Sequence, residues 1–202
     1  MNPVFFVTGF ARSRTAWLAN LLTYGPSYCH HDALRLGTTP EFLEKMFTDT
    51  WWHNEDVEYV GDSDSGLLAI APKVLKAFPD SRWVLIERPM EEAARSYFNA
   101  FKDTPYPQTP VMSLEQVRAL YLCISDWKDA FKKIVPGHLL MVVPFDRLGD
   151  EAVVASIWTW CVPAIPFNYE RFRMLNSFSV NIIPGKVEVM GDAAKRWAEV
   201  MA

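Results

Sequence analysis

The sequence predicts an α/β domain of three layers, α/β/α, in which helices cover both faces of a mostly parallel sheet. Val4–Val7 and Trp83–Ile86 are short, uninterrupted apolar runs, which are typical of strands buried on both faces. Segments with helical spacing of apolar residues lie between such runs, and strands that alternate with helices form parallel sheets. The length of 202 residues, half of them hydrophobic, fits a single domain spanning residues 1–202.

The remaining elements follow from local patterns along the chain. Thr15–Leu22 is a helix that ends at Gly25-Pro26, and Ser113 begins a helix with a capping-box partner at Gln116. The apolar stripe of that helix is expected to face the core; it comprises Val117, Leu120, Tyr121, Ile124, Trp127 and Phe131. We expect further strands at 28–31, 58–60 and 139–143, and further helices at 40–47, 89–101, 150–160 and 193–201. A helical segment ends at Ala77 and is begun or interrupted by Pro72, whereas 48–58 has no clear period and is interpreted as a loop or lid.

Composition excludes several classes of function. The formal net charge of −4 provides no bulk attraction to nucleic acid or to anionic membranes, and no apolar run is long enough to cross a bilayer. The N-terminus leads directly into the first predicted strand without a basic leader, so we expect a cytoplasmic protein. Cys29, Cys123 and Cys161 are interpreted as buried, reduced thiols. Without C-x-x-C or H-E-x-x-H spacing, the sequence predicts a mechanism that uses no metal.

The segment from Gly9 to Thr15 joins the first strand to the first helix and predicts an anion site. Backbone N–H groups at such a turn, together with the helix dipole, attract phosphate before any side chain contributes. Arg12 and Arg14 add positive charge, and Ser13 and Thr15 add hydroxyl donors. The segment is a degenerate P-loop in a P-loop NTPase-like fold, because the second glycine and the lysine of the nucleoside triphosphatase motif are missing.

Residues 9–18 resemble the 5′-phosphosulfate loop of the sulfotransferases, whose usual form is G-x-x-[RK]-S-G-T-x-x-L. The matching positions are Gly9, Arg12, Ser13, Thr15 and Leu18. Arg14 departs from the pattern, because the family has glycine there. If this position requires a positive φ or close approach of the nucleotide, an arginine causes strain or blocks the site.

Two later segments are similar to the same family. Residues 83–97 resemble its 3′-phosphate element, in which an arginine at a strand end is followed eight residues later by a serine on the next helix. Arg88 and Ser96 have this spacing, so both are expected to face one phosphate. Residues 140–148 are similar to the strand and tyrosine-glutamate-aspartate-leucine segment of the family. The resemblance does not extend beyond Tyr169.

The resemblance implies transfer of a sulfuryl group from 3′-phosphoadenosine 5′-phosphosulfate (PAPS) to a hydroxyl or amine. Arg12 takes the position of the basic residue at the leaving oxygen, while Gly9, Arg14, Ser13 and Thr15 belong to the loop around the 5′-phosphate. The general base is Asp32 with His31 beside it, or alternatively one of the acids that follow the third strand, Asp62 and Asp64.

The acceptor and the class of function remain open in the sequence. A small molecule, a sugar or an exposed tyrosine would suit an aromatic platform formed by Trp51, Trp52 and His53 together with residues 103–110. The alternatives are a P-loop nucleotide or small-molecule kinase and a non-catalytic relative that only binds nucleotide. The missing lysine and the lack of a clear Mg²⁺-holding acidic strand end argue against the kinase.

Overall fold

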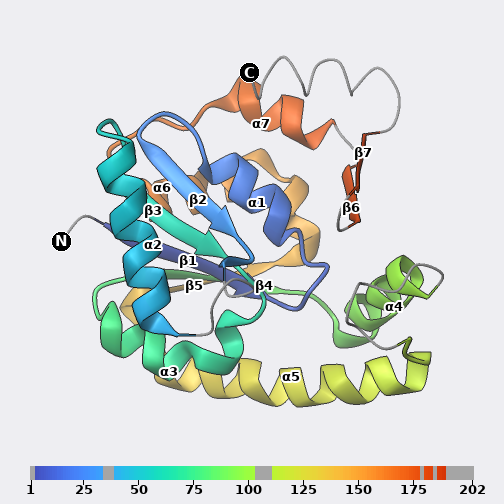
Figure 1. The fold of residues 1–202 in the computed structure, drawn as a ribbon. Coiled ribbons are helices and arrows are strands. Elements are labelled where there is room, and N and C mark those ends of the chain that lie inside the picture. Colours follow the sequence, from blue (N-terminus) through green and yellow to red (C-terminus); the bar gives the residue numbers. More distant parts are fainter. Residues whose placement is uncertain (1–2, 34–38, 103–110, 178–179, 184–185, 190–202) are drawn as a thin grey trace.

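Five parallel strands form the central sheet of the structure, a computed structural model that describes residues 3–33, 39–102, 111–177, 180–183 and 186–189 (Figure 1). The strand order is β2-β3-β1-β4-β5, and every neighbouring pair is parallel. The strands are β1 (Val4–Gly9), β2 (Ser27–His31), β3 (Tyr59–Ser63), β4 (Arg82–Glu87) and β5 (Leu140–Pro144). The predicted parallel sheet is therefore confirmed.

Helices cover both faces of this sheet, which confirms the three predicted layers (Figure 1). The helices are α1 (Thr15–Leu22), α2 (Pro40–His53), α3 (Leu67–Ala77), α4 (Met90–Phe101), α5 (Leu114–Ile134), α6 (Glu151–Cys161) and α7 (Tyr169–Asn176). Two short 3₁₀ helices, η2 (Gly137–Leu139) and η3 (Phe145–Gly149), flank β5, and β6 (Val180–Ile183) pairs antiparallel with β7 (Lys186–Val189). Among the described residues, no helix is both long and apolar enough to cross a membrane.

The continuous apolar run of β1 reflects burial on both sides of the sheet. Phe5 and Val7 belong to the cluster under α1, α6 and α7, whereas Phe6 belongs to the cluster under α2, α3 and α5. Successive side chains of a strand alternate between faces, so a strand between two helical layers needs apolar residues throughout. A third cluster, which includes Phe10 and Tyr121, fills the space between α4 and α5.

Local capping explains where several helices begin. The Ser113 hydroxyl accepts from the Gln116 backbone N–H at 3.2 Å, and the Gln116 side chain accepts from the Ser113 N–H at 2.8 Å. This is the predicted capping box, which satisfies two amide groups that the helix itself leaves unpaired. At α6, the Asp150 carboxylate accepts from the Ala152 N–H at 2.9 Å.

Four sequence-based predictions about local structure are wrong. Helix α2 continues to His53, so residues 48–53 are helical; Trp52 is 80% exposed and obscures the helical period that Phe47 and Thr50 maintain on the buried side. Helix α3 runs from Leu67 through Pro72 without interruption. In α5, one side of the predicted apolar stripe faces solvent at Leu120 and Trp127, and Cys123 beside it is exposed rather than buried. The predicted helix at 193–201 lies outside the described residues.

Candidate active site at the carboxyl edge of the sheet

Parallel pairing brings all of the predicted polar clusters to one edge of the sheet. Gly9 at the end of β1 lies opposite Ile86 of β4, and His31 at the end of β2 lies opposite Ser63 of β3. Ligands of open α/β sheets bind outside the carboxyl ends of the strands. The loop after β1, the acids after β2 and β3, and the arginine after β4 therefore share one edge.

The loop from Gly9 to Thr15 has a strained backbone. A Cβ at Gly9 would lie 2.7 Å from the Ile86 carbonyl oxygen, so no larger residue fits beside β4. Arg12 has φ 68° and Arg14 has φ 62°, both in the left-handed region that favours glycine. Each such residue costs on the order of 1 kcal/mol. Of the two possibilities left open at position 14, a positive φ or a close approach of the nucleotide, the structure has the positive φ, and it has a second one at position 12.

Three polar atoms around this loop are buried without a hydrogen-bond partner in the described part of the chain. They are Ser13 Oγ, Arg12 Nε and Arg88 Nε. Buried polar groups are almost always hydrogen-bonded, and an orphaned one costs about 1–3 kcal/mol. A bound anion that accepts from all three donors would remove this cost.

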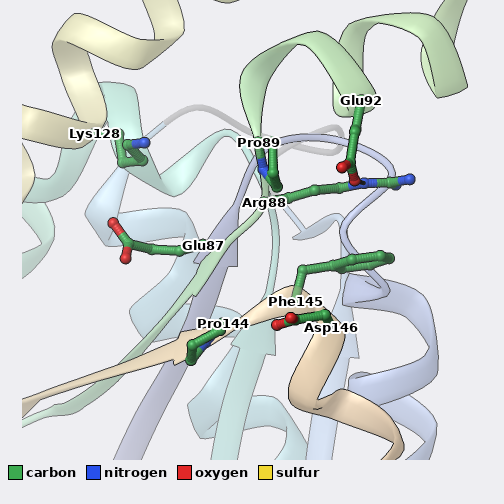
Figure 2. A pocket seen from close by; sticks show the side chains of 8 residues that line it. All are labelled: Glu87, Arg88, Pro89, Glu92, Lys128, Pro144, Phe145 and Asp146. Atoms are coloured by element: carbon green, nitrogen blue, oxygen red, sulfur yellow. Dashed lines mark ion pairs between the residues drawn. The ribbon is translucent and has the colours of Figure 1, made fainter.

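Arg88 connects the second predicted cluster to the loop. Its Nη1 donates to the Arg12 carbonyl. Its guanidinium lies 4.1 Å from the centre of the Phe145 ring, and its Nε is 3.9 Å from a carboxylate oxygen of Glu92; Figure 2 shows these three side chains together. Only 15% of the Arg88 side chain is exposed. Burial, and to a smaller extent the charge of Arg12, lower the pKa of Arg88, while Glu92 opposes this shift. Arg88 is thus a mostly buried cation close to a second one, an environment that a bound anion would stabilise.

The two other predicted phosphate ligands are placed differently. The Arg14 guanidinium is 3.3 Å from the Leu148 carbonyl oxygen, 3.4 Å from Asn176 Oδ1 and 5.2 Å from the Trp17 ring. It therefore contacts η3 and α7, and the structure does not bring it together with Arg88. Ser96 lies half-buried on α4, and no hydrogen bond within the described residues joins it to Arg88.

Helix α5 supports the loop through a contact that sequence reasoning missed. The Tyr121 hydroxyl donates to the Ala11 carbonyl at 3.2 Å, and its ring stacks on Phe10 with 5.4 Å between centroids. Burial raises the pKa of Tyr121, so the phenol stays protonated and can donate. The apolar stripe of α5 placed Tyr121 in the core, but nothing in the sequence indicated where its hydroxyl would bond.

A cavity of about 410 Å³ opens beside Arg88, between the ends of β4 and β5 and the start of α4 (Figure 2). This volume lies within the range of small-ligand pockets. The lining residues are Glu87, Arg88, Pro89, Glu92, Lys128, Pro144, Phe145 and Asp146. The cavity thus combines acidic and basic side chains with one aromatic face, and sequence reasoning selected only Arg88 among its polar side chains.

The candidate bases form two neighbouring groups at the ends of β2 and β3. His31 Nε2 is 3.4 Å from Asp32 Oδ1 and 3.5 Å from Thr15 Oγ1, which brings the predicted pair next to the phosphate loop. Asp62 is fully buried; one of its oxygens accepts from the Ala33 N–H at 3.4 Å, and the other has no partner among the described residues.

The electrostatic environment separates these candidates. Burial raises the pKa of Asp62 well above its ordinary value, and the charges of Asp64 and Asp32 raise it further. The surroundings of Asp62 therefore disfavour its charged form, and its full burial keeps it away from an acceptor at the edge of the sheet. His31 retains 31% side-chain exposure and Asp32 retains 16%, so both can be reached from the edge of the sheet.

Comparison with known proteins identifies the fold. No family model matches the sequence, and a search of the curated proteins gives no significant match. Among solved structures, the chain is similar to mouse sulfotransferase SULT7A1 complexed with PAP, with a TM-score of 0.58 and 13% identity over 87% of this chain and 64% of that chain. It is also similar to a sulfotransferase from Alicyclobacillus acidocaldarius, with a TM-score of 0.60 and 16% identity over 84% of this chain and 83% of that chain.

A third similar structure is the sulfotransferase domain from the curacin biosynthetic pathway, with a TM-score of 0.55 and 14% identity over 84% of this chain and 76% of that chain. This chain spans less than two thirds of the mouse protein. The chain has the fold of the sulfotransferases.

Proposed function

We propose that the protein is a sulfotransferase that uses PAPS and moves its sulfuryl group to a hydroxyl or amine acceptor. The observation that carries this proposal is the pairing of Arg12 and Arg88 around a loop where the Ser13 hydroxyl has no partner among the described residues. Two cations and several orphaned donors at a helix N-terminus suit a ligand with two separate phosphate groups. PAPS carries phosphates at both the 5′ and the 3′ positions.

The loop would hold the 5′-phosphosulfate, and Arg88 would bind the 3′-phosphate. Arg88 is fixed by the Arg12 carbonyl and by the Phe145 ring, so little side-chain freedom is lost when it binds a phosphate. Glu92 lies 3.9 Å from Arg88 and is mostly exposed, so it can move aside for a more highly charged anion. Ser96, on the same helix, would add a hydroxyl donor.

The chemistry requires a base for the acceptor and charge stabilisation for the departing nucleotide. The acceptor oxygen or nitrogen attacks sulfur, the bond between sulfur and the 5′-phosphate oxygen breaks, and the acceptor proton moves to the base. Arg12 would stabilise the negative charge that develops on the phosphate oxygen. We assign the base to His31, oriented by Asp32, because His31 lies beside Thr15 and is partly exposed, whereas Asp62 is fully buried.

Transfer of labelled sulfate from PAPS to a panel of phenols, sugars, amines and tyrosine peptides tests this function. Arg12→Ala should lower kcat by about 10²-fold, the scale seen when a charge-stabilising donor is lost. His31→Ala should lower kcat with little change in nucleotide affinity. Tight nucleotide binding without transfer to any acceptor would instead indicate a non-catalytic relative, and transfer of phosphate from MgATP would indicate a kinase.

A further inference from the structure

Helix α5 carries a second apolar stripe that the fold leaves uncovered. Its members are Leu120, Cys123, Trp127, Ala130 and Ile134, and all of them are exposed. Leu120, Trp127 and Ile134 have exposed fractions of 38%, 46% and 42%. The face that packs on the rest of the molecule is a different one, formed by Val117, Tyr121 and Phe131. In Figure 1, α5 is the outermost element below α3 and α4, so its uncovered side is accessible.

The spacing of this stripe is that of a coiled-coil seam. Its members alternate at intervals of three and four residues over two heptads, the pattern with which two long helices bury a shared apolar line. Helix α5 has 21 residues, about 31 Å, which is long enough for such a seam. Scattered exposed apolar residues are ordinary on a surface, but a contiguous line at seam spacing marks a contact site.

The charges beside the seam indicate what covers it. Asp126 and Lys133 each directly precede a seam residue, and neither forms an ion pair within the described part of the chain. If a second α5 packs antiparallel with its Ala130 opposite Trp127, the largest seam residue meets the smallest. Asp126 of one copy then lies within about two residues, or about 3 Å along the axis, of Lys133 of the other copy.

We propose that the partner of this seam is a second copy of the same chain, packed α5 against antiparallel α5 about a two-fold axis. The symmetry produces two Asp126–Lys133 pairs, one on each side of the axis. A parallel arrangement lacks this complementarity, because it places Asp126 beside the core-facing side of the other helix. A seam of this length buries an area near the lower limit for specific interfaces, about 1,200 Å², so the dimer is reversible and depends on concentration.

Sedimentation velocity over a range of protein concentrations tests the dimer, since the monomer mass is 23.1 kDa. The wild-type chain should move from monomer to dimer as its concentration rises. Asp126→Lys or Lys133→Asp alone should weaken the dimer about tenfold, because each creates two like-charge pairs. The double variant Asp126→Lys with Lys133→Asp should restore the dissociation constant to within about threefold. These positions are exposed, so the swaps preserve folding, which circular dichroism verifies.

Trp127→Glu should abolish the dimer, whereas Trp52→Glu, at a more exposed position on α2, should leave it unchanged. A chain that remains monomeric at every concentration would overturn the proposal. A dimer that persists in Trp127→Glu, or single and double charge swaps with equal effects, would overturn it as well, because the contact would then lie elsewhere.

Discussion

Substitution of Arg88 by alanine probes the second phosphate site directly. Arg88 Nη1 is held by the Arg12 carbonyl and its guanidinium by the Phe145 ring, while Nε has no hydrogen-bond partner among the described residues. If Nε and the rest of the guanidinium bind the 3′-phosphate, the variant loses a charge-assisted hydrogen bond of about 1.5–3 kcal/mol. The affinity for adenosine 3′,5′-bisphosphate (PAP) should then fall by about 10- to 150-fold. AMP, which lacks the 3′-phosphate, should bind within about threefold of the wild-type affinity.

Isothermal titration of PAP and AMP into both proteins measures this contrast. Arg82→Ala is the matched control, because Arg82 lies at the opposite end of β4, donates to the Trp160 carbonyl at 2.7 Å and stacks on its ring. The control removes the same charge and similar structural contacts, yet it should leave both affinities unchanged. Equal losses of PAP and AMP binding in a folded Arg88→Ala protein would refute the assignment and make Arg88 a structural residue of the loop.

Three further predictions concern stability. Burial lowers the pKa of His30 to about 4, so the unfolded chain takes up a proton first as the pH falls, and stability is lost between about pH 6.5 and 4. Over that pH interval, the free energy of unfolding of His30→Gln, measured by urea denaturation, should fall by about 1–2 kcal/mol less than that of the wild-type protein. An equal fall in both proteins would contradict this interpretation. Because the pKa of Asp62 is raised in the folded chain, the folded chain keeps a proton that the unfolded chain releases above about pH 4. The free energy of unfolding therefore falls as the pH rises. Asp62→Asn should therefore raise Tm at pH 8 and have little effect near pH 4; a lower Tm at pH 8 would show that the carboxylate is stabilising. Gly9→Ala places a Cβ 2.7 Å from the Ile86 carbonyl oxygen and should cost about 1–3 kcal/mol in chemical denaturation, whereas Gly137→Ala, with open space around it, should change stability by less than about 0.5 kcal/mol.

The sequence predicted the sheet and most helices because local patterns and burial agree. The apolar run that contains Phe5 and Phe6 needs no long-range information to indicate a strand buried on both faces, and Ser113 with Gln116 is sufficient to begin a helix. The end of α2 was not predicted, because the apolar Trp52 lies on the exposed side of the helix. A polar residue at that position would have continued the pattern of apolar residues on one side and polar residues on the other. The exposed side of α5 was missed because apolar residues occupy both its buried face and its seam.

The sequence predicted which loops form the site, but it did not predict where the side chains of those loops point. The glycine of the family pattern left two reasons open at Arg14, a positive φ or a close approach of the nucleotide, and the structure has the positive φ. The direction of the Arg14 side chain depends on Asn176, 162 residues away in the sequence, and no local pattern contains that contact. The same holds for the bond from Tyr121 to Ala11 and for the place of Glu92 beside Arg88 at the cavity, since both depend on how α4 and α5 pack at the edge of the sheet.

Thermal unfolding with PAP in the presence of EDTA, compared with MgATP, tests the central claim most directly. A nucleotide that binds only the native state at about 100 times its Kd adds about 2.7 kcal/mol, which for a chain of this size raises Tm by roughly 5–10 °C. We predict such a shift with PAP and EDTA, because the proposed site holds both phosphates with arginines and backbone amides. A shift with MgATP and none with PAP would contradict the account and identify a metal-dependent phosphoryl site in its place.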